Sequence, residues 1–321
     1  MVNITRRQLG VAAVLGLALT SCLNGGPTAP GESGIWKATN VHVVTVGGLD
    51  RSYTLHVPSR LLRGTGGVVA PYPLVIVMHG SSDDGKGIEA TSQMDVVADS
   101  ALFIVAYPNG TGGRFSVYAS DWNAGTCCGG AERDNVNDLG FITALIKHTS
   151  QHVAVDVRRV YVAGFSAGAL MAYHAGCQLS TSIAAIAVVE GSIADDKCRP
   201  TKAVSLWAVH GTDDPEVAFS EPSATPLTGS VPVAARALPP SVQFWAAVQK
   251  CTGGSTKAVS AAVTNSQITG CTSGAVVEFN KIAGGTHGWP GGTTEPGSVA
   301  PMNQLKSSIE MWKFFAKHTR N

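Results

Sequence analysis

Residues 160–173 read Val160-Tyr161-Val162-Ala163, then Gly164-Phe165-Ser166-Ala167-Gly168, then Ala169-Leu170-Met171-Ala172-Tyr173. This order predicts a buried strand, a sharp turn of the G-x-S-x-G type and a helix. Glycines on both sides leave room for a strained turn, which would put the Ser166 hydroxyl at the tip of the strand. Ser166 is therefore the predicted nucleophile, although small residues here would also simply let a helix pack on a sheet.

Continuous apolar runs elsewhere in the chain predict further buried strands. They cover residues 73–78, 102–106, 184–189 and 204–209, and two β-branched runs at 41–46 and 52–57 predict an opening hairpin. Helical spacing is found at about 87–100, 138–152, 167–178, 240–250 and 303–318. This alternation predicts a single α/β domain with a mostly parallel central sheet and helices on both faces.

A serine hydroxyl needs a base, and with this motif the acid and the base are expected to follow in the order Ser, Asp or Glu, His. The run 204–209 ends in His210-Gly211-Thr212-Asp213-Asp214-Pro215, and His287 comes later, within Gly284–Gly291. A histidine among glycines and beside Trp-Pro suits a shaped loop better than a core, so His287 is the predicted base. Asp213 and Asp214 are neighbours, and only one of them can point at it.

Two backbone N–H groups are expected to bind the oxyanion of the reaction. One belongs to Ala167, which follows the predicted nucleophile. The other is expected in the loop Met78-His79-Gly80-Ser81-Ser82, at the end of an early strand. We predict the N–H of Ser81, with Gly80 as the alternative. The Pro-, Ser- and Thr-rich stretch 220–240 is expected to be a loop or cap over the site rather than a linker.

Residues 1–21 have the features of a lipoprotein signal peptide. Paired arginines precede an apolar run that is too short to span a bilayer as a helix but suits a signal. The run closes on Leu19-Thr20-Ser21-Cys22, which resembles a lipobox with an acylated cysteine. We expect export, a lipid anchor at Cys22 and a flexible tether over 22–37. An ordinary secretory signal that contains a cysteine is the alternative.

Composition favours one globular domain, and the net charge does not indicate a strongly charged partner. Of 321 residues, 44% are apolar and 14% are charged, which is enough to bury a large core. Removing the leader, which holds Arg6 and Arg7 and no acid, leaves 21 basic and 22 acidic residues. A nearly neutral chain gives no electrostatic reason to bind nucleic acid, so no nucleic-acid partner is expected.

The chain has seven cysteines, and setting Cys22 apart leaves six. Export would permit disulfides, and short sequence separation suggests the pairs Cys177–Cys198 and Cys251–Cys271. Cys127 and Cys128 remain, and as adjacent residues they could bond only to each other. A metal site is the competing interpretation, but no cysteine pair lies beside a histidine at zinc-ligand spacing, so none is expected.

Several segments together carry a resemblance that covers residues 38–318. They are Arg51-Ser52-Tyr53-Thr54-Leu55, residues 73–80, Tyr107-Pro108-Asn109-Gly110, residues 122–129, Asn137-Asp138-Leu139-Gly140-Phe141, and the segments 164–168, 210–215 and 284–291. In combination they resemble the polyhydroxybutyrate-depolymerase-like serine esterases, which include feruloyl and acetylxylan esterases. Within that family the chain is most similar to the bacterial exported lipoprotein esterases.

The resemblance implies an α/β-hydrolase catalytic domain over 38–321 that uses no metal and no organic cofactor. In the family the acid precedes proline in a His-Gly-Thr-x-Asp-Pro segment, which selects Asp214 over Asp213. The chain departs from the family at Thr286 and Gly288, where relatives have Gly and Thr around the base. It also has Ser81 where many relatives carry Cys or Gly, so the substrate class does not carry over with the resemblance.

These patterns predict an exported serine esterase that acts on small-molecule or polymeric carboxylic esters through an acyl-enzyme. Its membrane contact would be made only through the N-terminal lipid anchor. A soluble or cell-envelope ester is favoured over solid polyester, because no separate polymer-binding segment is recognised. Two alternatives stay open: a cell-envelope acyltransferase that uses the same triad, and a non-catalytic surface-binding protein on the same scaffold.

Overall fold

The structure is a computed structural model that describes residues 39–62, 71–112, 120–227, 229–293 and 302–320. These residues lie within one compact unit, Trp36–Asn321. The expected signal peptide (1–21), the Cys22 anchor and the tether (22–37) lie outside the described residues. Within the described part of the chain, no helix has both the length and the apolar character needed to cross a membrane.

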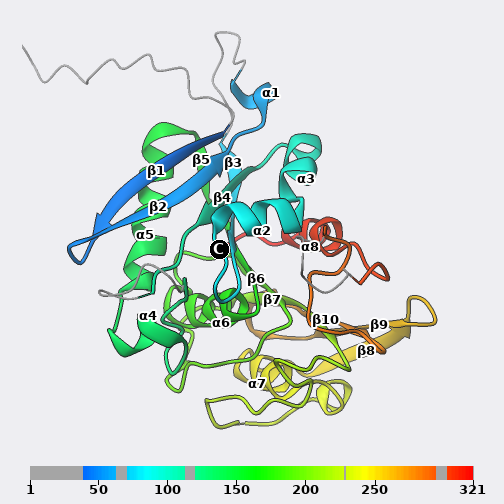
Figure 1. Ribbon diagram of the computed structural model, residues 1–321. Helices are drawn as coiled ribbons and strands as arrows, with labels where there is room; N and C mark the ends of the chain where they lie inside the picture. Colours follow the sequence, from blue (N-terminus) through cyan, green and yellow to red (C-terminus); the bar gives the residue numbers. More distant parts are fainter. Residues whose placement is uncertain (1–38, 63–70, 113–119, 228, 294–301, 321) are drawn as a thin grey trace, which may run out of the picture. The chain divides into compact units, whose positions relative to one another are not determined.

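A sheet of ten strands organises the described chain (Figure 1). The strands are β1 (Thr39–Val46), β2 (Leu49–His56), β3 (Tyr72–Met78), β4 (Ile104–Pro108), β5 (Val155–Phe165), β6 (Ala185–Val189), β7 (Ser205–Gly211), β8 (Gly253–Ala258), β9 (Val263–Thr269) and β10 (Val277–Ile282). Their order is β1-β2-β4-β3-β5-β6-β7-β10-β9-β8. The six strands from β4 to β10 are parallel, whereas the two outer strands at each edge pair antiparallel.

Helices cover both faces of this sheet (Figure 1). One face packs against α5 (Asp138–His152), α6 (Ala167–Gln178) and α7 (Pro240–Val248), and the other against α2 (Gly85–Ser92), α3 (Met94–Ala101) and α8 (Ser307–Phe315). The connections contain the short helices α1 (Ser59–Leu62) and α4 (Gly129–Arg133) and the 3-10 turns η1 (Val233–Ala235) and η2 (Thr272–Gly274).

The central strand β3 shows why a continuous apolar run marks a parallel strand. Leu74, Ile76 and Met78 pack with the helices of one face, whereas Val75 and Val77 pack with those of the other. Successive side chains of a strand point to opposite faces, so a strand covered on both sides is buried at every position. The apolar runs predicted from the sequence therefore correspond to β3 to β7.

The structure corrects the sequence-based expectation in two places. The helix expected over 87–100 is divided into α2 and α3, because Gln93 between them has a left-handed backbone with φ of 53°. The strands β8, β9 and β10 were not predicted. Five of the six residues of β8 are exposed, and polar residues interrupt the apolar residues of β10 (Val-Glu-Phe-Asn-Lys-Ile), so neither presents a long apolar run.

One buried ion pair ties the first strands to α5. Arg51 Nη1 lies 2.6 Å from Asp138 Oδ1, and the two side chains are 3% and 0% exposed. The Arg51 guanidinium also lies over the Phe141 ring, 4.3 Å from its centroid. Burial raises the pKa of Asp138 and Arg51 opposes that rise, so this carboxylate depends on its partner.

We expect Arg51→Leu to lower the free energy of unfolding by about 3–5 kcal/mol, because it leaves a buried carboxylate without its ion-pair partner. The control is Arg133→Leu, since Arg133 is 68% exposed beside Asp134. Its removal should cost less than about 1 kcal/mol. Urea unfolding measures both variants, and equal losses would contradict the importance assigned to the buried pair.

Candidate active site

Ser166 lies at a strained turn where β5 ends and α6 begins. Its backbone has φ of 53° and ψ of −121°, a conformation that residues with a side chain rarely adopt. The Ser166 N–H donates to the Val189 carbonyl oxygen at 3.0 Å, which ties the turn to the end of β6. Strain of this kind persists where the surrounding structure enforces it, and it is common at functional sites.

The glycines of the turn are required by close packing. A Cβ atom added at Gly164 would collide with the backbone of Gly168, and one added at Gly168 would collide with the carbonyl oxygens of Met78 and His79. The start of α6 therefore lies directly on the ends of β5 and β3. Alanine at either position would force the nucleophile turn away from the sheet.

Asp214 and His287 form a buried hydrogen-bonded pair although 73 residues separate them. Asp214 Oδ2 lies 2.8 Å from His287 Nδ1, and the two side chains are 0% and 7% exposed. The other carboxylate oxygen accepts the N–H groups of Glu216 and Val217, at 2.8 and 3.0 Å. Asp213, in contrast, is exposed and accepts a hydrogen bond from the Thr212 hydroxyl. The structure thus brings Asp214, and not Asp213, to His287.

The environment of Asp214 stabilises its charged form. Burial alone would raise its pKa, but hydrogen bonds from His210, His287 and the two backbone N–H groups outweigh burial and hold the pKa below its usual value. An acid kept charged beside Nδ1 orients the imidazole and leaves Nε2 available for proton transfer.

His287 lies beside the nucleophile turn. Its ring packs against Phe165, the neighbour of Ser166, with 4.9 Å between ring centroids. Its Nε2 atom lies 3.8 Å from a carboxylate oxygen of Glu216, whose side chain is 66% exposed. Glu216 was not singled out from the sequence.

The loop after β3 passes close to Ser166. A Cβ added at Gly80 would lie 3.3 Å from Ser166 Cβ, and Ser81 lines the same cavity as Ser166 and Ala167. His79 and Trp122 shape this loop: the Trp122 indole N–H donates to the His79 carbonyl oxygen at 2.9 Å. His79 Nε2 accepts the Gly110 N–H at 2.8 Å, which leaves Nδ1–H to donate to the Gly80 carbonyl at 2.6 Å.

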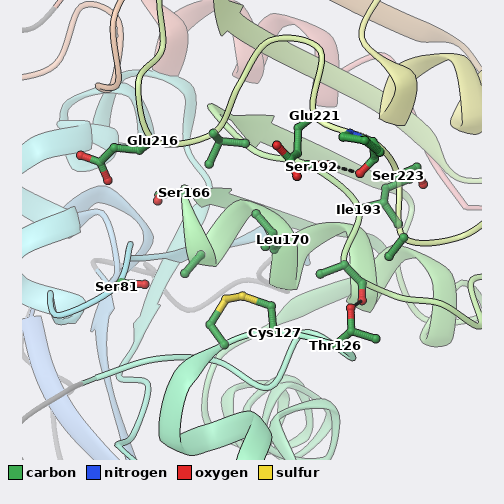
Figure 2. A pocket seen from close by; sticks show the side chains of 16 residues that line it. Ser81, Thr126, Cys127, Ser166, Leu170, Ser192, Ile193, Glu216, Glu221 and Ser223 are labelled. Carbon is green, nitrogen blue, oxygen red and sulfur yellow. Dashed lines mark hydrogen bonds between the residues drawn. A yellow bond between two sulfur atoms is a disulfide. The ribbon is translucent and has the colours of Figure 1, made fainter.

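A cavity of about 580 Å³ opens beside Ser166 (Figure 2). Leu170, Ile193 and the Cys127–Cys128 disulfide contribute apolar surface, and the loop after β7 contributes Glu216 and Glu221. No lysine or arginine is among the described residues that line it. Within the stretch 220–240, which was expected to cover the site, residues 221–224 line the cavity. η1 and the start of α7 belong to the same stretch but are not among the described residues that line it.

Three disulfides join the six cysteines of the described chain: Cys127–Cys128, Cys177–Cys198 and Cys251–Cys271. The last two are the pairs suggested by sequence separation, and the first joins the two cysteines that remained. The second links the end of α6 to the loop after β6, and the first forms part of the cavity wall.

Two groups of donor side chains in the described chain lie close enough to hold a metal ion. One consists of Cys177, Asp195 and Cys198, but its two sulfurs are already bonded to each other. The other consists of Glu190, His210 and Asp214, behind His287. Glu190 was not predicted from the sequence. The one feature that could have pointed to it is its place as an acidic residue directly after a buried strand. The Nε2 atom of His210 lies 2.8 Å from the Val217 carbonyl oxygen.

The chain matches the family model described as "Esterase PHB depolymerase" over residues 52–221, more than half of its length. Feruloyl esterase B of Piromyces equi is 31% identical over 56% of this chain and 33% of its own length. NocK of Nocardia uniformis subsp. tsuyamanensis is 26% identical over 91% of this chain and 92% of its own. The fold is similar to that of an acetyl xylan esterase from Aspergillus awamori, with a TM-score of 0.57, 14% identity, and coverage of 78% of this chain and 94% of that one.

The parallel sheet, the helices on both faces and the strand–serine–helix turn define an α/β-hydrolase fold. Within this fold class, the protein belongs to the esterase PHB depolymerase family. The predicted fold class and family are thereby confirmed. The chain spans less than two thirds of the first curated relatives that it matches, 22% and 33% of their lengths.

The geometry predicts opposite behaviour for two adjacent aspartates. Asp214→Asn should lower kcat by about 10³–10⁴-fold, because the amide cannot hold His287 in the same tautomer. Asp213→Asn should change kcat by less than about threefold, because this exposed side chain does not reach the pair. Steady-state kinetics on a simple aryl ester measures both variants. A severe loss in the Asp213 variant with a mild one in the Asp214 variant would reverse the choice of acid.

Proposed function

We propose that the protein is an exported serine esterase that hydrolyses carboxylic esters through an acyl-enzyme on Ser166. The main support is the buried Asp214–His287 pair, which lies next to the strained Ser166 turn. Ser166 itself lines a cavity. Nucleophile, base and acid come from three different strand ends, β5, β10 and β7, in the chain order that the motif requires.

In the first step, His287 takes the Ser166 proton at Nε2 while the serine oxygen attacks the ester carbonyl carbon. Asp214 stabilises the imidazolium that forms, through its bond to Nδ1. The N–H groups of Ala167 and Ser81 are the proposed donors to the oxyanion, with Gly80 as the alternative to Ser81. The imidazolium then protonates the leaving alcohol, and the acyl group stays on Ser166.

In the second step, a water molecule replaces the alcohol. His287 removes its proton, the hydroxide oxygen attacks the acyl carbonyl carbon, and the carboxylic acid leaves as Ser166 regains its proton. The cavity beside Ser166 offers an apolar wall for part of the ester, and the N-terminus of α6 favours negative charge at the turn.

Export and lipid anchoring are part of the proposal. The three disulfides support an oxidising compartment, because such bonds rarely persist in the cytosol. The leader over 1–21 and Cys22 support a lipoprotein that touches the membrane only through its acylated N-terminus.

The first test treats the purified, exported full-length chain with a fluorophosphonate probe and then with a panel of acetyl, butyryl and feruloyl esters. We expect covalent labelling at Ser166 together with turnover. Ser166→Ala should abolish both, since the nucleophile is gone. A Ser166→Ala protein that keeps activity within about tenfold of the unmodified chain would reject the acyl-enzyme mechanism. Added alcohol acceptors distinguish transfer of the acyl group from hydrolysis.

The cavity also predicts a preference for neutral acyl groups. Glu216 and Glu221 line it without a lysine or arginine among its described residues, so a negatively charged substrate meets repulsion. We expect kcat/KM for a pentanoate ester to exceed that for the matching hemisuccinate by about tenfold or more at low salt. The double variant Glu216→Gln, Glu221→Gln should reduce this ratio, and 0.5 M salt should reduce it in the unmodified enzyme. A ratio that neither change alters would contradict the electrostatic explanation.

A further inference from the structure

Glu190 is a fully buried acid that the proposed mechanism does not use. It follows β6 directly, its exposure is 0%, and its backbone φ is 51°. A charged carboxylate in such a position is costly unless it is paired or neutral. The contacts of its side chain indicate which of the two applies.

The Glu190 carboxyl group lies against the loop that carries Asp214. Its two oxygens are 3.1 and 3.0 Å from the Gly211 N–H, at the end of β7. One of them is 3.4 Å from His210 Nε2, and that nitrogen is 3.3 Å from Asp214 Oδ2. A carboxyl oxygen of Glu190 also lies within 4.8 Å of a carboxyl oxygen of Asp214. Four groups, Glu190, His210, Asp214 and His287, are thus connected in one buried chain.

Two carboxyl groups this close cannot both carry charge in a buried environment at low cost. Asp214 accepts hydrogen bonds from His287 and from two backbone N–H groups, which favour its charged form. Glu190 accepts one shared N–H from Gly211. The proton of the pair therefore belongs on Glu190, and an un-ionised Glu190 can donate it in the hydrogen bond to Asp214.

We infer that Glu190 is a positioning residue: an un-ionised carboxylic acid that accepts the Gly211 N–H and donates a hydrogen bond to Asp214, so that Asp214 stays aligned with His287. This inference rests on the proposed function of the Ser166 site. Glu190 itself touches no reacting atom and acts only through Asp214.

The titration of this acid follows from its surroundings. Burial raises the pKa of Glu190 from 4.5 to about 10, the Asp214 charge adds to the rise, and the Gly211 N–H opposes it. The titratable groups facing it in the described chain are His210, on β7, and Asp214, on the following loop. A raised pKa means that the folded protein binds one more proton than the unfolded chain between these two values. The contribution of Glu190 to stability therefore falls as pH rises from about 5 to about 10.

The test compares Glu190→Gln with Glu190→Leu in the full-length chain. Glutamine keeps an acceptor for Gly211 and a donor for Asp214 and does not titrate, whereas leucine has a similar volume and forms neither bond. Glu310→Gln is the matched control, since the Glu310 side chain is 39% exposed on α8 and pairs with Lys313. Each protein is measured for kcat and KM on an aryl ester, for fluorophosphonate labelling rate, and for Tm from pH 5 to pH 10.

We expect Glu190→Gln to retain kcat within about threefold near pH 7 and Glu190→Leu to lose about tenfold or more in kcat and labelling rate with KM little changed. The Tm of Glu190→Gln should rise relative to the unmodified protein as pH increases, and the Glu310→Gln difference should stay constant. A Glu190→Leu enzyme whose kcat equals that of the unmodified protein would overturn the inference.

A Tm difference between Glu190→Gln and the unmodified protein that does not change with pH would also overturn it. If Glu190→Leu does not fold, the pH dependence of the Tm difference between Glu190→Gln and the unmodified protein is by itself the test of the inference. The Tm measurement needs no turnover, so it tests the protonated Glu190 even if Ser166 proves not to be a nucleophile. Labelling of the unmodified protein reports separately on the proposed function.

Discussion

The strained backbone at Ser166 is the constraint on which the rest of the site depends. A left-handed residue between a buried strand and a helix requires that the helix lie almost on the strand ends, and Gly164 and Gly168 make that approach possible. Hydrogen bonding to Val189 then ties the turn to β6. The backbones of the β5–α6 turn and of the loop after β3 are in direct contact next to Ser166, so neither segment can move without the other.

Charge in the site is arranged around a single buried anion. Asp214 is kept ionised by donors from His287, His210 and the loop backbone, whereas Glu190 a short distance behind is kept neutral by burial and by that same anion. One negative charge is enough to stabilise an imidazolium, and a second ionised carboxylate so close to Asp214 would be repelled by it at low dielectric. The exposed carboxylates, Glu216 and Glu221, instead face the cavity and act on what enters it.

One segment, residues 122–128, contacts the loop after β3 and also forms part of the cavity wall. Trp122 donates to the His79 carbonyl, and the same segment continues into the Cys127–Cys128 disulfide that lines the cavity. Asn123 in this segment donates its N–H to Asp138, the partner of Arg51 in the buried ion pair. The loop that carries Ser81 is therefore supported by a series of contacts that reaches from α5 to β2.

Local sequence patterns determined the strand–turn–helix at Ser166, the buried strands β3 to β7 and the order serine, aspartate, histidine, because each depends on backbone periodicity or on a few adjacent residues. The family resemblance, and not the residues alone, selected Asp214. Only the tertiary structure decided that Asp214 points to His287 while Asp213 faces solvent, that Glu190 lies behind them, and that β8 to β10 extend the sheet. These features depend on packing between segments far apart in the chain. A shift of one residue in strand register changes which side chains meet, and one buried neighbour changes whether an acid such as Glu190 holds its proton.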